Sequence, residues 1–138
     1  MKRKAEINRK SYETDISLFI CLEGEGNIEI DSGIGFFDHM LTLLAAHGSF
    51  DISLRCVGDL YGDGHHTVED IGIVFGKAFR KALGDRKGIN RYGTVFVPMD
   101  ECLAMVSLDI SGRPYLHYEV PEMAERVGDF DTELLEEF

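Results

Sequence analysis

The chain has 138 residues, enough for one compact domain, and its 25 acidic and 14 basic residues give a formal net charge of −11. Because the phosphates of nucleic acids attract clustered lysine and arginine, this charge argues against a general nucleic-acid-binding protein, although a few placed arginines can still bind a small anion. No apolar run approaches the roughly 20 residues that cross a bilayer, so we expect no membrane partner.

The apolar residues of the first half follow strand periodicity and then helix periodicity. Residues 16–22 and 28–30 alternate with the two-residue period of strands, and the glycine-containing turn between them predicts a hairpin. The spacing then predicts a helix over 36–47, a strand over 50–57 and a second helix over 65–83. The expected order is strand, strand, helix, strand, helix.

The second half repeats the first. Residues 13–24 and 101–112 have equal length, begin with Glu, end with Gly and place apolar residues at matching positions. The pattern GxFDxxL at residues 35–41 also recurs at residues 128–134, which predicts a second-half helix starting near Asp131. We interpret this as tandem duplication, with a first repeat over 1–87 and an incomplete second repeat over 88–138. The expected fold class is a two-layer α/β (α+β) fold.

The repeat length bears on how much of the second copy is present. Compared with the first half, the second half lacks roughly 45 to 50 residues, so we expect a truncated chain. Its unpaired second-half helix should then expose an apolar face that favours self-association. This face consists of Phe130, Leu134, Leu135 and Phe138.

Three cysteines and the first residues of the chain indicate its compartment. Cys21, Cys56 and Cys102 lie in apolar, strand-like segments without CxxC spacing, and the charged start develops no apolar signal-peptide core. We therefore expect a cytoplasmic protein whose thiols are buried and reduced.

The segment DGHHTVED (63–70), at the start of a predicted helix, is the strongest chemical signal. His65 and Glu69 are four residues apart, and His66 and Glu69 three, so an imidazole and a carboxylate can point the same way. Such ligands suit Mn, Fe, Zn or Ni. Adjacent helical residues point about 100° apart, so the two histidines would serve different metal ions or subunits. The alternative is a capped helix start with surface histidines.

Five further residues are weaker candidates. His39 lies on an apolar helix, where a lone histidine is more often a core residue or a buried polar anchor, and His47 is more often a C-terminal cap. Each gains weight only if it converges on the His65–His66 pair. Arg91 and Arg113, in turns beside strands, present planar guanidinium groups that fit phosphate or form surface ion pairs. His117 alternates with apolar residues in a predicted strand and is expected to be structural.

Together, these segments resemble the imidazoleglycerol-phosphate dehydratase family of histidine biosynthesis. The resemblance covers the whole chain through a collinear series that includes GIGFFDHML (33–41), HHTVEDIG (65–72), ALGDRKGI (82–89), DISGRPYL (109–116) and GDFDTELLEEF (128–138). It implies a tandem duplication of a ribosomal-protein-S5-domain-2-like unit whose second copy is incomplete here.

The resemblance also implies a function. Family members are metal-dependent lyases that dehydrate imidazole glycerol phosphate to imidazole acetol phosphate, with two Mn2+ ions per site shared between subunits of a homo-oligomer, a trimer-based 24-mer in the full-length family. Matching positions imply metal ligands at His39, His65, His66 and Glu69, substrate-binding residues at Glu13, His39, His47, Arg91 and Arg113, and catalytic carboxylates at Glu13 and Glu69.

One part of the family pattern is missing from the sequence. The family's second HHxxE motif lies in the region that this chain lacks, so half of the implied metal ligands are absent. We therefore expect impaired activity for the 138-residue form. The alternative is a non-catalytic metal-binding or assembly fragment.

Overall fold

The computed structural model describes residues 2–138, which divide into two compact units. Unit 1 combines the residues up to Gly84 with Val120–Phe138, and unit 2 is Asp85–Glu119. Among the helices of residues 2–138, none has the length and apolar character that a bilayer span requires.

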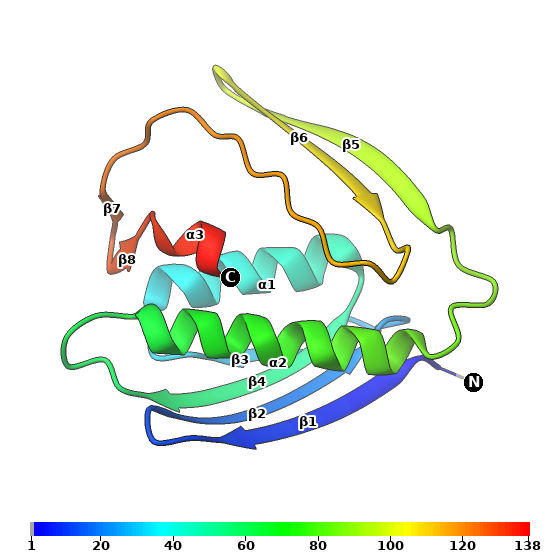
Figure 1. The fold of residues 1–138 in the computed structure, drawn as a ribbon, viewed down its shortest axis with the longest axis horizontal. Coiled ribbons are helices and arrows are strands. Elements are labelled where there is room, and N and C mark those ends of the chain that lie inside the picture. The colour runs from blue at the N-terminus through cyan, green and yellow to red at the C-terminus, as the bar shows by residue number, and fades with distance from the viewer. Residues whose placement is uncertain (1) are drawn as a thin grey trace. The chain divides into compact units, whose positions relative to one another are not determined.

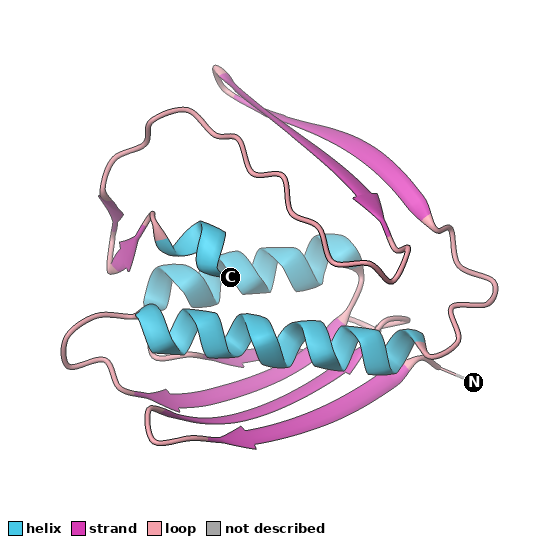
Figure 2. Cartoon of the chain, viewed as in Figure 1, coloured by secondary structure: helices cyan, strands magenta, loops and turns pink. Residues whose placement is uncertain are grey.

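Unit 1 is a two-layer structure in which a four-stranded sheet carries two helices on one face (Figures 1 and 2). The sheet has the order β1-β2-β4-β3, and α1 and α2 pack against it through buried aliphatic side chains. The helices begin and end within a residue of the predicted ranges, because both have long helical spacing and end at glycine. The bounds are β1 Lys4–Lys10, β2 Thr14–Cys21, β3 Ile28–Asp31, α1 Gly35–Gly48, β4 Asp51–Gly58 and α2 His65–Leu83.

The predicted hairpin between β2 and β3 is wrong, because β4 lies between these strands. β4 pairs antiparallel with β2 and parallel with β3. The connection is fixed by Asp51, whose Oδ1 accepts hydrogen bonds from the backbone N–H groups of Glu25, Gly26 and Asn27 at 2.7–2.9 Å. One carboxylate at the start of β4 therefore holds the loop that carries the chain across the sheet.

Strand β1 was not among the predicted elements. Only Ala5 and Ile7 of its seven residues are apolar, so the alternation is too short to stand out. β1 pairs antiparallel with β2 at the edge of the sheet, where charged side chains are tolerated. The buried Ala5 nevertheless joins the core.

The C-terminal part of unit 1 packs beside the start of α1 (Figure 1). It contains β7 (Arg126–Val127), β8 (Phe130–Asp131) and the short α3 (Leu134–Glu137). The helix thus begins three residues after the predicted start near Asp131, which lies in β8. The Phe130 ring stacks on that of Phe37 with centroids 5.7 Å apart.

The expected exposed apolar face at the C-terminus is partly wrong. Phe130 and Leu134 are only 2% and 3% exposed, because they enter the core formed by α1 and α2. Leu135 and Phe138 remain 42% and 40% exposed, although the Phe138 ring also contacts that of Phe37. The segment therefore buries half of this face within its own chain.

Unit 2 contains an antiparallel hairpin of β5 (Tyr92–Met99) and β6 (Cys102–Asp109) in which every residue is exposed. Cys102 is accordingly exposed, so the expectation of three buried thiols holds only for Cys21 and Cys56. The alternation of apolar residues around Cys102 indicates which side chains share a face of the strand, but it does not indicate whether another element covers that face. His117 lies outside any strand, contrary to expectation, and its Nε2 is 3.5 Å from Glu119 Oε2.

Candidate metal and substrate site

The start of α2 brings an imidazole and a carboxylate together. His65 Nε2 lies 4.0 Å from Glu69 Oε2, one helical turn further on, and both side chains are 44% exposed. The helix can begin here because Asp63 Oδ1 accepts a 2.9 Å hydrogen bond from the backbone N–H of His65. Gly64 lets the loop sit close to the core, since a Cβ there would lie 2.8 Å from Ile34 Cδ1. The pair is therefore open to a cation.

His66 lies next to His65 with its ring plane nearly perpendicular to that of His65. The rings of His65 and His66 are 6.0 Å apart at the centroids and meet at 88°. Across residues 2–138, no three or more His, Cys, Asp or Glu side chains gather closely enough to hold a metal ion. His65 and Glu69 thus fit two positions of a transition-metal site, and the remaining ligands would have to come from water or another chain.

The two histidines of α1 are exposed and lie near opposite ends of the helix. His39 is in its second turn, so its interpretation as a buried anchor is wrong, and His47 is in the last turn beside the left-handed C-cap residue Ser49. Helices α1 and α2 begin at the same end of the unit (Figure 1). His39 therefore lies toward the end of unit 1 where the His65–Glu69 pair starts, whereas His47 lies at the far end of α1.

Glu13 is exposed in the turn between β1 and β2. Its backbone carbonyl accepts a 2.8 Å hydrogen bond from the N–H of Asp59, just after β4, and its own N–H donates to Ser11 Oγ at 3.2 Å. The backbone of this turn is thus fixed against the loop that leads into α2. The Glu13 carboxylate remains accessible.

A buried polar cluster beneath the turn was missed in the sequence. The Thr14 hydroxyl donates to Asp70 Oδ2 at 2.5 Å, and Arg9 forms an ion pair with the same oxygen. Burial alone would raise the pKa of Asp70, but the hydrogen bonds from Thr14 and Arg9 outweigh burial and lower the pKa below its ordinary value. The only local signal was Asp70 within the motif, because its partners lie far away in sequence.

Unit 2 holds the two predicted arginines in different settings. Arg91 donates to both carboxylate oxygens of Asp109, at 2.7 and 3.1 Å, and this pairing raises the pKa of the arginine. The same contact lowers the pKa of Asp109. Arg113 is exposed, and its backbone N–H donates to Ser111 Oγ at 3.2 Å.

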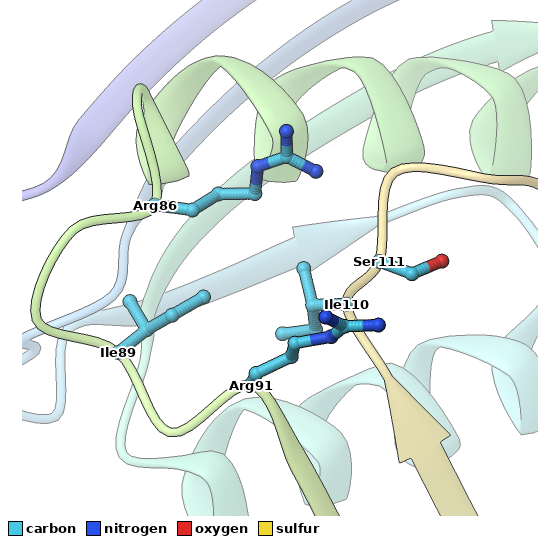
Figure 3. Close-up of a pocket in the computed structure, with 5 residues that line it drawn as sticks. All are labelled: Arg86, Ile89, Arg91, Ile110 and Ser111. Atoms are coloured by element: carbon cyan, nitrogen blue, oxygen red, sulfur yellow. The ribbon is translucent and has the colours of Figure 1, made fainter.

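An open pocket of about 250 Å3 lies beside Arg91. Figure 3 shows its lining residues, which are Arg86, Ile89, Arg91, Ile110 and Ser111. Arg113 is not among them. Arg86, which lies in the turn after α2 and carries no prediction, extends over Gly112, where an added Cβ would clash with the Arg86 guanidinium. Two guanidinium groups and a hydroxyl make this pocket suited to a small anion.

The fold is that of a two-layer α/β protein with an accessible His65–Glu69 pair at a helix start, and comparisons with known proteins specify the class. The profile of the imidazoleglycerol-phosphate dehydratase family matches residues 32–138. Imidazoleglycerol-phosphate dehydratases of Caldanaerobacter subterraneus and Gluconobacter oxydans are 60% and 58% identical to the chain over 136 residues. These matches cover 99% of this chain and 70% and 69% of the relatives.

Solved structures agree with the sequence comparison. The crystal structure of imidazoleglycerol-phosphate dehydratase from Staphylococcus aureus aligns with a TM-score of 0.84 at 40% identity, covering 97% of this chain and 73% of that one. The enzyme from Pyrococcus furiosus aligns with a TM-score of 0.79 at 37% identity, covering 95% and 69%. The chain belongs to the imidazoleglycerol-phosphate dehydratase family, the hydro-lyases of histidine biosynthesis.

Proposed function

We propose that this chain dehydrates imidazole glycerol phosphate to imidazole acetol phosphate with bound Mn2+, in an assembly of several copies. The observation that carries the proposal is the convergence of His65 and Glu69 at 4.0 Å on an accessible helix start, in a chain of this family. His66 and His39 would supply ligands to sites shared with other copies of the chain. A Mn2+ ion held there would supply Lewis-acid stabilisation of developing negative charge.

The other proposed residues supply proton transfer and substrate binding. The exposed Glu13 carboxylate, on a turn fixed by its backbone, is suited to moving a proton at the substrate carbon. Arg91 and Arg113 would bind the substrate phosphate, and His47 would lie near the substrate. Because Asp109 already neutralises Arg91, phosphate binding there requires the two anions to share one guanidinium or the ion pair to open.

The incomplete ligand set of one chain supports a homo-oligomer. Two potential ligands lie 4.0 Å apart in the described part of the chain, and no third His, Cys, Asp or Glu side chain there gathers with them closely enough to hold a metal ion. We propose that copies of the chain, arranged as in the trimer-based family assembly, bring ligands together, and that an isolated copy turns over slowly. The two buried cysteines, both with free thiols, support a reducing, cytoplasmic location.

The hairpins of the two units support tandem duplication. In β1–β2 the residues Lys4 and Cys21 are paired, and in β5–β6 the residues Tyr92 and Asp109 are paired. Tyr92 lies 88 residues after Lys4, and Asp109 lies 88 residues after Cys21. The two hairpins therefore pair their strands in the same register. We propose repeats over 1–87 and 88–138, each built on an S5-domain-2-like unit.

The incomplete ligand set also favours a second candidate, a metal-binding fragment without catalysis. A direct test measures formation of imidazole acetol phosphate by mass spectrometry, with and without Mn2+, while light scattering records the assembly. We expect Mn2+-dependent product from the assembled chain and none from Glu13→Gln, with His117→Ala as a matched surface control. Stoichiometric Mn2+ uptake without product would favour the second candidate.

A further inference from the structure

The buried Thr14 and Asp70, with the half-buried Arg9, form a polar connection, here called the turn–helix cluster, between two parts of unit 1. Thr14 begins β2 directly after Glu13, and Asp70 lies in the second turn of α2 directly after Glu69. Both are buried, and the hydrogen bond between them spans 56 residues of sequence. Arg9 binds both members, through its ion pair with Asp70 and a 3.3 Å hydrogen bond to Thr14 Oγ1.

The turn side of the cluster is closed by short-range hydrogen bonds. Ser11 Oγ accepts from the N–H of Thr14 at 3.1 Å, and the Ser11 N–H donates to the Thr14 carbonyl at 2.8 Å. The Ser11 hydroxyl also lies 3.3 Å from Thr14 Oγ1. The position of Thr14 therefore determines the path of the turn and the point from which the Glu13 side chain extends.

The helix side is equally constrained. Asp70 lies four residues after His66 and next to Glu69, so fixing its carboxylate fixes the rotation of the first two turns of α2. A buried carboxylate that loses a hydrogen-bond donor is destabilised. The Asp70 carboxylate therefore favours one orientation of α2 relative to the Glu13 turn. None of the three residues belongs to the proposed ligand or substrate-binding set.

We propose that Arg9, Thr14 and Asp70 are positioning residues that hold the Glu13 turn in register with the metal-binding start of α2. The catalytic meaning of this inference rests on the proposed function, because it assumes that Glu13 and α2 act on one substrate. The mechanical part of the inference, that the turn is held against the helix by hydrogen bonds, does not rest on the proposed function.

Amide hydrogen exchange tests the mechanical part. Thr14→Val removes the hydroxyl while keeping the shape of the side chain, and we expect exchange of residues 11–14 to accelerate at least about tenfold, because the hydrogen bonds of the hydroxyl with Asp70 and Arg9 are both lost. Thr14→Ser keeps the hydroxyl and should stay within about twofold of wild type. Asp15→Asn, which removes an exposed ion pair with Lys10 on the same hairpin, is the matched control. Amides in the last turns of α2 report global opening and should accelerate no more than those of residues 11–14.

Kinetics of the Mn2+-loaded assembly test the catalytic part. We expect Thr14→Val to lower kcat about tenfold while KM and Mn2+ affinity stay within about twofold, and Thr14→Ser to restore kcat. Unchanged exchange at residues 11–14 in a folded Thr14→Val protein would overturn the proposal, as would a kcat no lower than that of Asp15→Asn. If the wild type neither binds Mn2+ nor forms product, the proposed function fails while the exchange result still decides the positioning role.

Discussion

The carboxylate of Asp129 and the backbone N–H of Gly35 meet at 2.6 Å, although 94 residues separate them in the sequence. The other carboxylate oxygen accepts from the N–H of Phe36 at 3.0 Å. The first N–H groups of a helix have no partner within it, and a negative charge there is favourable. Asp129 therefore caps α1 from the C-terminal segment.

Replacement of Asp129 should loosen this segment. We expect Asp129→Ala to lower the thermal midpoint and to accelerate amide exchange in residues 126–138, because two N–H groups of α1 lose their acceptor. Glu136→Gln removes an exposed carboxylate of α3 and serves as the matched control. Equal exchange in the two variants would contradict a capping role.

The contribution of Asp129 should also depend on pH. Its hydrogen bonds from Phe36 and Gly35 lower the pKa of Asp129 from the ordinary value of 3.8. A group whose pKa is lowered on folding stabilises the protein above its unfolded pKa, and this stability is lost as the pH falls through the folded pKa. The difference in thermal midpoint between wild type and Asp129→Ala should therefore be full at pH 6 and shrink below pH 4.

The C-terminal segment offers a test of core packing with an internal control. Leu134 is buried and its neighbour Leu135 is 42% exposed. We expect Leu134→Ala to destabilise unit 1 by about 2–5 kcal/mol, the range for a buried leucine, and Leu135→Ala by much less. Urea unfolding measures both. Similar losses in the two variants would indicate that the segment does not pack into the core as described.

Binding of Mn2+ should depend on the pair at the start of α2. Loss of a residue that only supports a ligand weakens metal binding about 10–100-fold, so we expect His65→Ala and Glu69→Ala each to weaken it at least tenfold. His117→Ala should bind as the wild type does. Electron paramagnetic resonance of free Mn2+ gives the affinities, and EDTA should reverse the binding. Wild-type affinity in both ligand variants would exclude this pair as a site.

The three cysteines should differ sharply in reactivity. Burial, with the nearby Asp70 carboxylate, raises the pKa of Cys56 to about 11, whereas Cys102 is exposed. A pKa of about 11 leaves on the order of one thiolate in a thousand at pH 8, and the thiolate is the reactive form. We expect rapid labelling of one thiol per chain by a disulfide reagent. Cys102→Ser should abolish the rapid labelling, and Cys56→Ser should leave its rate unchanged.

The sequence predicted the elements whose signals are local. Helices α1 and α2 follow from long helical spacing that ends at glycine, and the convergence of His65 with Glu69 follows from helix geometry alone. These features need no information about distant parts of the chain. That the two histidines serve different metal ions or subunits stays a prediction.

The features that were missed depend on distant partners. The position of β4 between β2 and β3 is fixed by the contact of Asp51 with residues 25–27, which no periodicity reveals. The bond between Thr14 and Asp70 likewise joins a residue outside every motif to the last residue of the motif at 63–70. Whether Glu13, His39, His47 and the arginines act on a common substrate is a matter of assembly, and remains a prediction.

Unit 1 is discontinuous in sequence, and this affects how the chain completes its fold during synthesis. The ring of Phe37 emerges early, but its partner Phe130 follows only after the whole of unit 2 has been translated. Until then, a nascent chain presents an uncovered aromatic surface at the start of α1. Such surfaces are bound by chaperones or associate with one another, so Phe130 removes an aggregation-prone surface only at the end of synthesis.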